Sequence, residues 1–92
     1  MDEIEILSRI DQGSFVFKAE NPEDPNEQEG FRSVVHVIRA LERRGLVKVN
    51  SYVAPNKRGE HFRKRVDRVL VEYITRPGKM ELRRRRATES FL

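Results

Sequence analysis

The chain has 92 residues, a net charge of +4, 37% apolar and 37% charged residues, and no cysteine. This length supports one domain with a modest core, and the composition is that of a highly charged folded protein rather than a disordered one. The absence of cysteine excludes disulfides and cysteine–zinc sites, and no apolar run approaches the roughly 20 residues of a membrane span.

The charge is divided unevenly along the chain. Residues 1–30 carry nine acidic and two basic residues, whereas residues 31–92 carry six acidic and seventeen basic ones. A basic excess of this size usually serves polyanions, and its attraction is salt-dependent. The first residues are acidic, the opposite of a signal peptide, so we expect a cytoplasmic, intracellular protein without a membrane partner.

The first predicted element is a short helix over residues 2–12. Ile4, Leu7 and Ile10 recur at helical spacing and give it an apolar side. Gly13 favours the end of this helix, because glycine readily adopts the left-handed conformation that follows a last turn.

Residues 14–19 alternate in the manner of a short strand. Phe15 and Phe17 would then share one face of it. We interpret the pair as core side chains, and the alternative is a platform on which nucleic-acid bases stack.

The central element is a helix over residues 26–45. It follows an exposed, acidic loop, residues 20–29, whose two prolines block helix formation before Asn26. Asn26 and Glu29 have the spacing of a capping box, which predicts that Asn26 caps the helix. Gly45 stands where a left-handed residue would end it.

This central helix has two distinct faces at 100° per residue. An apolar stripe, which should be buried, consists of Phe31, Val34, Val35, Ile38 and Leu41. A second stripe, at positions i, i+4, i+7 and i+11, consists of Arg32, His36, Arg39 and Arg43. Like charges stacked in this way repel one another, and a polyanion lying along the face would remove the repulsion.

Residues 46–54 and 66–75 predict two strands paired as a hairpin. The second segment is ambiguous, because its apolar residues also fit a helical stripe. We favour the strand, since β-branched and aromatic residues dominate it. Five basic residues would form the tip of this hairpin: Lys57, Arg58, Arg63, Lys64 and Arg65.

Pro77 and Gly78 predict the end of the second strand. We therefore place the folded domain at residues 1–79 and a mobile basic tail at residues 80–92. The arginine run 83–86 is either a solubilising segment or a non-specific phosphate hook.

No catalytic arrangement is visible in the sequence. His36 and His61 are 25 residues apart, without acids at ligand spacing, and there is no glycine-rich phosphate loop. The carboxylates cluster in a loop, where exposure to solvent would leave their pKa values unsuited to acid–base catalysis. We therefore expect no enzyme activity, no cofactor and no metal site.

The order of the predicted elements resembles a winged-helix (winged helix-turn-helix) domain. Residues 6–10, Ile-Leu-Ser-Arg-Ile, resemble its first helix. Residues 40–47, Ala-Leu-Glu-Arg-Arg-Gly-Leu-Val, are similar to the junction of recognition helix and wing in transcriptional regulators of the MarR type, and residues 74–79 are similar to the segment after their wing. The likeness covers roughly residues 3–79. One departure is that the family's second helix is shortened or replaced by the acidic, proline-containing loop.

The resemblance implies an α+β, winged-helix-like domain that binds double-stranded DNA as a transcriptional regulator. The residues expected to face the major groove are Arg32, Ser33, His36 and Arg39. The residues expected to neutralise phosphates are Arg43, Lys57, Arg58, Arg63, Lys64 and Arg65.

Two alternatives to DNA remain open: an interaction module whose basic face meets an acidic protein, and a structured-RNA binder. A single domain of this kind would bind weakly, so specificity would need a homodimer or another partner. Val37 and Tyr52 are the candidate exposed apolar contacts for such a partner.

Overall fold

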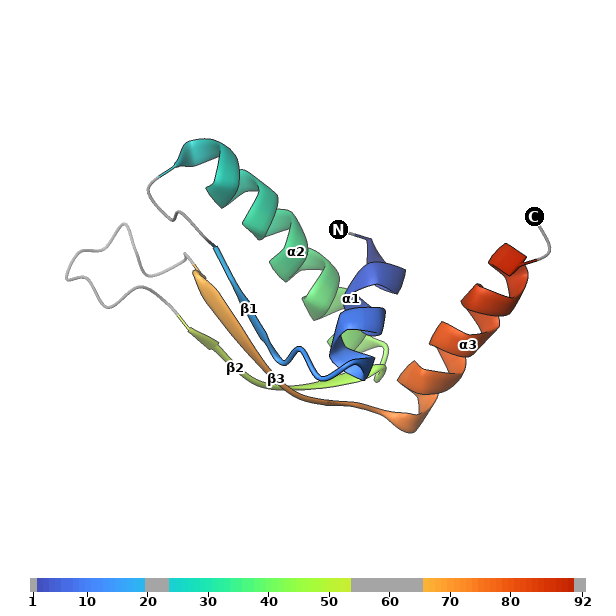
Figure 1. Cartoon of the computed structure of the whole chain (residues 1–92). Helices are drawn as coiled ribbons and strands as arrows, with labels where there is room; N and C mark the ends of the chain where they lie inside the picture. The colour runs from blue at the N-terminus through green and yellow to red at the C-terminus, as the bar shows by residue number, and fades with distance from the viewer. Residues whose placement is uncertain (1, 20–23, 54–65, 91–92) are drawn as a thin grey trace.

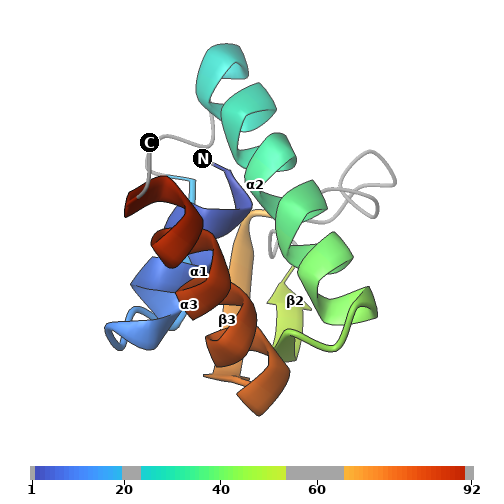
Figure 2. The same cartoon turned by 90° about the vertical axis from the view of Figure 1, so that its right-hand side faces the viewer.

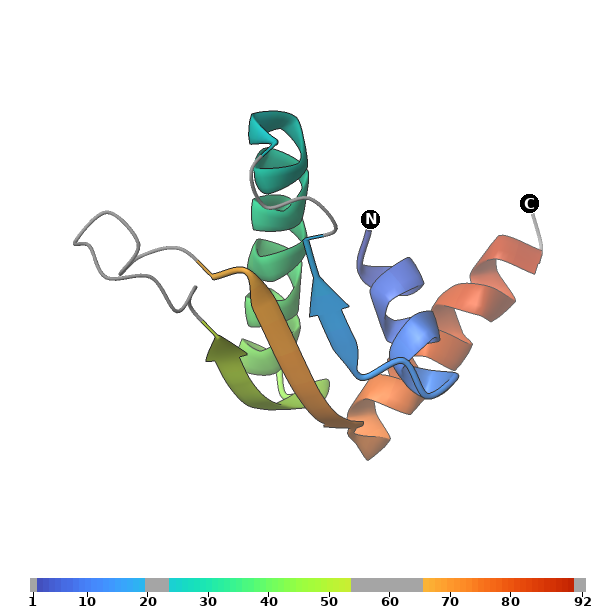
Figure 3. The same cartoon turned by 60° about the vertical axis from the view of Figure 1, so that its left-hand side comes forward.

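The computed structural model describes residues 2–19, 24–53 and 66–90, which form an α+β arrangement of helices and an antiparallel sheet. The elements in chain order are α1 (Glu3–Asp11), β1 (Val16–Lys18), α2 (Pro25–Arg43), β2 (Val47–Val53), β3 (Arg68–Ile74) and α3 (Arg76–Ser90). β1 and β2 each pair antiparallel with the middle strand β3 (Figure 3). α1 and α2 lie over one face of the sheet, and α3 lies against α1 (Figure 1, Figure 2). The α+β class and the predicted strand pairing are confirmed.

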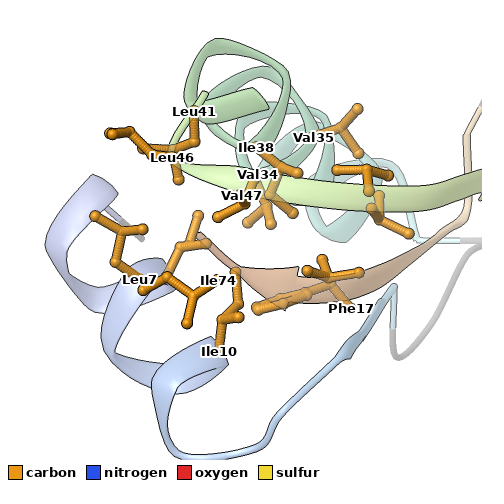
Figure 4. Packing of buried hydrophobic residues seen from close by; sticks show 14 of the residues in the cluster. Leu7, Ile10, Phe17, Val34, Val35, Ile38, Leu41, Leu46, Val47 and Ile74 are labelled. Atoms are coloured by element: carbon orange, nitrogen blue, oxygen red, sulfur yellow. The ribbon is translucent and has the colours of Figure 1, made fainter. Parts of the chain in front are cut away.

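The core fills the space between α1, α2 and the sheet (Figure 4). It consists of Ile6, Leu7, Ile10, Phe17, Phe31, Val34, Val35, Ile38, Leu41, Leu46, Val47, Val49, Val69, Val71, Ile74 and Leu82. The predicted apolar stripe of α2 is buried at all five positions. Of the aromatic pair near β1, Phe17 is core as expected, whereas Phe15 is 41% exposed.

The predicted start of α2 is wrong. The side chain of Asp24, not Asn26, caps this helix by accepting a hydrogen bond of 2.9 Å from the Asn26 amide. Pro25 occupies the first turn instead of blocking the helix. A backbone N–H in this turn would have no intrahelical partner, so proline loses no hydrogen bond there, and its fixed φ is already helical. Glu29 therefore lies inside the helix and is not part of a capping box.

The predicted glycine stops are confirmed. Gly45 follows α2 with a φ of +73°, and Gly13 follows α1 with a φ of +101°. At the end of α2, the Gly45 amide donates to the Glu42 carbonyl and the Leu46 amide donates to the Leu41 carbonyl, both at 2.9 Å. This is the Schellman pattern, which satisfies carbonyls that the helix itself leaves unpaired.

The strand predicted over residues 66–75 pairs with β2 through a register that contains two irregularities. The register skips Glu72 on β3 and Asn50 on β2. Because of the skipped residue, Val71 and Ile74 are both buried although they are three positions apart, a spacing typical of helices. The strand prediction is nevertheless confirmed over Arg68–Ile74.

The prediction of a mobile tail is wrong for the described residues after β3, because they form α3. Thr75 begins this helix: its hydroxyl accepts a bond of 3.1 Å from the Gly78 amide and donates one of 2.7 Å to the Gly45 carbonyl. Leu82 in the second turn is only 1% exposed. Pro77 and Gly78, expected to end a strand, lie in the first turn of α3, where proline is tolerated.

A network of ion pairs joins α3 to the other two helices. Glu3 of α1 accepts from Arg44, at the end of α2, at 2.9 Å and from Arg85 of α3 at 3.0 Å. Glu81 of α3 accepts from Arg84 at 2.7 Å and from Arg85 at 3.0 Å. These bonds, with Arg84 first and Arg85 second, lower the pKa of Glu81. The hydrogen bond to Glu81 in turn raises the pKa of Arg85. α3 is therefore fixed to the domain by charge as well as by Leu82.

Candidate nucleic-acid interface

The predicted basic stripe of α2 lies on the surface of the molecule. We call it the α2 basic face, and it consists of Arg32, His36, Arg39 and Arg43, each of them exposed. Since burial of the apolar stripe fixes the rotation of α2 against the sheet, these four side chains point away from the core. From Arg32 to Arg43 the face advances by 11 residue steps, or about 16 Å along the helix.

None of the protein's described acids neutralises this face. The described parts of the chain contain no salt bridge to any of its four members. Glu42, which directly precedes Arg43 in α2, accepts a hydrogen bond from the Tyr52 hydroxyl instead. The result is a row of cationic and hydrogen-bonding groups that are open to solvent.

Arg39 is held in place by a residue from the sheet. Its guanidinium carbon lies 4.8 Å from the centre of the Tyr52 ring, within the range of a cation–π contact. The Tyr52 hydroxyl donates a bond of 3.1 Å to Glu42 Oε1. Burial, together with the bond to the Glu42 carboxylate, raises the pKa of Tyr52 to about 12, so the ring stays neutral at physiological pH. Glu42 and Tyr52 therefore orient Arg39 while its exposed side chain remains available.

Ser33 is less suited than the other α2 residues to face the major groove, the role predicted for it. It is exposed, but it lies about 100° around the helix from Arg32. Its hydroxyl makes a long bond of 3.4 Å to the carbonyl of Glu29, one turn earlier in the same helix. The structure thus brings the other four predicted α2 residues together and sets Ser33 apart from them.

The five hairpin residues predicted to contact phosphates lie outside the described residues: Lys57, Arg58, Arg63, Lys64 and Arg65. The strand that leads toward them, β2, ends at Val53, directly after Tyr52. Val37 and Tyr52, predicted as exposed apolar contacts, are instead half-buried against the core. The link between Tyr52 and Arg39 has no local signal in the sequence, because the two residues are 13 positions apart and meet only through packing.

A shallow hollow of about 440 Å³ lies elsewhere, between β1 and the N-terminal half of α2. Phe17, Phe31 and Lys18 are among the residues that line it. No member of the α2 basic face does so, and the hollow is therefore a separate feature.

The described residues contain no group of three or more acids or histidines able to hold a metal ion. None of the described helices combines the length and the apolar character that crossing a bilayer requires. Comparisons with protein-family models, with curated proteins and with solved structures give no significant match to this chain.

Proposed function

We propose that this chain is a small winged-helix-like module that binds double-stranded DNA through the α2 basic face and acts in transcriptional regulation. The observation that carries the proposal is that Arg32, His36, Arg39 and Arg43 are exposed on one helix face and form no salt bridge with any described acid. A helix can enter the major groove, which is about 12 Å wide.

Arg39 is the residue best placed to read a base. Its orientation by Tyr52 reduces the conformational freedom that it would otherwise lose on binding. Its guanidinium could donate two parallel bonds to a guanine edge, as could that of Arg32 two turns earlier. Arg43, in the last turn of α2, would contact a phosphate and position the helix without reading sequence.

The arrangement around α2 supports the winged-helix form of the proposal. α2 leads through the Gly45 turn directly into β2, and β2 pairs with β3. The segment between these two strands contains the five basic hairpin residues, which would act as the wing and contact phosphates beside the groove.

Binding should be tested by fluorescence anisotropy with short duplex DNA, duplex RNA and an acidic peptide, each over a series of salt concentrations. The double variant Arg32→Ala, Arg39→Ala should bind duplex DNA about 30-fold more weakly or worse, since each bidentate contact to a base is worth about 1–3 kcal/mol. The matched control Lys18→Ala, Lys48→Ala removes the same charge from exposed positions on β1 and β2.

The control should bind nearly as well as the wild type. An equal loss in both double variants would mean that net charge alone drives binding, and the assignment to α2 would be wrong. Binding of the acidic peptide without binding of either duplex would establish the protein-interaction alternative instead.

A further inference from the structure

The arginine run of α3 is divided between two faces of the helix. Arg84 and Arg85 bond to Glu81, and Arg85 also bonds to Glu3. Arg86 donates a bond of 2.6 Å to the Ser8 hydroxyl of α1. These three arginines are thus engaged with the protein itself.

The remaining basic residues of α3 lie on its solvent side. We call this the outward α3 face, and it consists of Arg76, Lys79 and Arg83, with Met80 beside them. All four are exposed, Met80 at 64%. None of the three cations makes a salt bridge within the described parts of the chain. Glu81, by contrast, keeps only 13% of its side chain exposed and is taken up by arginines.

This face is presented by a helix that is firmly held. The Thr75 hydroxyl bonds to the turn after α2, and Leu82 is buried in the core. A β-carbon at Gly78 would overlap the Leu46 carbonyl oxygen, which shows how closely the start of α3 approaches that turn. The outward cations therefore have a fixed position relative to α2.

We propose that the outward α3 face is a second phosphate-binding surface, which contacts the backbone of the same DNA duplex that α2 enters. This inference rests on the function proposed above. Arg76, Lys79 and Arg83 are spaced i, i+3 and i+7, so they span about 10 Å of helix. One strand of a duplex presents a phosphate about every 3.4 Å along its axis, so three contacts fit this length.

The end of α2 and the start of α3 share one junction, so a ligand as long as a DNA duplex could contact both helices. The end of α2 meets the start of α3 through the Gly45–Thr75 bond and the contact of Arg44 with Glu81 (Figure 2). Arg43, the last residue of α2, and Arg76, the first residue of α3, lie at the two helix ends that this junction joins. An anionic membrane is a poorer fit, because a membrane-surface helix needs an apolar side and the outward face offers only Met80.

The test compares the salt dependence of duplex binding in matched full-length variants. Arg76→Gln, Lys79→Gln, Arg83→Gln should lower the slope of log K against log salt by about 2.7, which corresponds to three lost phosphate contacts. The control Lys18→Gln, Lys48→Gln, Arg68→Gln removes the same charge from exposed positions elsewhere and should leave the slope unchanged. Within α3, Arg84→Gln should affect the slope less than Arg83→Gln, because Arg84 is paired with Glu81. Thermal melts check that each variant is folded.

A wild-type slope in the α3 triple variant, with binding still lost in Arg32→Ala, Arg39→Ala, would overturn this inference and leave the proposed function intact. Equal loss of slope in the α3 variant and its control would also overturn it. Failure of the wild type to bind duplex DNA would reject both proposals, and binding to anionic phosphatidylserine vesicles but not to duplexes would assign the face to membranes. In the wild type, backbone amide resonances of residues 76–83 should shift on addition of duplex DNA.

Discussion

Gly78→Ala gives the sharpest test of how α3 is attached. Alanine is the better helix former by up to about 1 kcal/mol, so propensity alone predicts a more stable protein. The structure predicts the opposite. The added methyl group would overlap the backbone carbonyl oxygen of Leu46 and would lie 2.8 Å from Ile74 Cγ1. The overlap with Leu46 cannot be relieved by rotation of a side chain, since that oxygen belongs to the backbone.

The size of the effect follows from what has to move. Overpacking of this kind costs about 1–3 kcal/mol. Displacement of α3 would also weaken the bond of 3.0 Å from the Thr75 amide to the Leu46 carbonyl, a contribution of about 1 kcal/mol. After subtraction of the propensity gain, the free energy of unfolding should fall by about 1–3 kcal/mol. In a domain of this size, each kcal/mol lowers the melting temperature by about 4–8 °C.

Gly30→Ala is the matched control, because Gly30 lies within α2 and a β-carbon there would meet nothing within 4 Å. Urea unfolding followed by circular dichroism should show that Gly30→Ala stabilises the protein by about 0.5–1 kcal/mol while Gly78→Ala destabilises it. If both substitutions stabilised the protein, the close approach of α3 to the Leu46 turn would be refuted.

Three further outcomes are expected. Leu82→Ala should lower the free energy of unfolding by about 2–5 kcal/mol, because the side chain is 1% exposed, and urea titration measures this loss. Because the pKa of Glu81 is lowered, its ion pairs stabilise the fold fully above its ordinary pKa and less as the pH falls through the lowered value. The melting temperatures of the wild type and Glu81→Gln should therefore converge on acidification. Glu42→Gln should reduce the pKa of Tyr52 from about 12, because the carboxylate that accepts from the hydroxyl and disfavours the phenolate is lost; NMR titration of the Tyr52 ring carbons reports this change.

The features that the sequence predicted well are those set by local periodicity. The five apolar positions of α2 recur at helical spacing and are all buried, so the rotation of the helix and the exposure of Arg39 follow from the pattern alone. Gly45 is another local signal, since a left-handed residue directly after a helix favours glycine.

The errors arose where local rules compete or where a distant contact decides. At α2, Asp24 and Asn26 are both good caps, and Pro25 between them favours Asp24 because proline fits the first turn. At α3, glycine is required at position 78 because the Leu46 carbonyl, 32 residues earlier in the chain, leaves no room for a β-carbon. No local rule for glycine reveals this contact. The arginine run resembled a solvated tail because Glu3, which binds Arg85, is 82 residues away.

The energetics of α2 explain how the fold tolerates a row of like charges. A pair such as Arg39 and Arg43, at i and i+4, destabilises the helix by only about 0.2–0.5 kcal/mol. A fully buried valine, leucine or phenylalanine contributes about 1.5–3 kcal/mol, and α2 buries five such apolar side chains. Burial therefore outweighs the repulsion several-fold, and the basic face does not need to be neutralised for the helix to form.

The positions of the protein's own carboxylates divide its arginines into those that are paired within the fold and those that are open to a ligand. Glu3 and Glu81 are themselves only 28% and 13% exposed, and they bind Arg44, Arg84 and Arg85. Neither the α2 basic face nor the outward α3 face receives a salt bridge from a described acid. The desolvation cost of Glu3 and Glu81 explains why arginines pair with them, whereas an exposed cation needs no partner within the protein. A polyanion that lies across the α2–α3 junction would supply the negative charge that both surfaces lack.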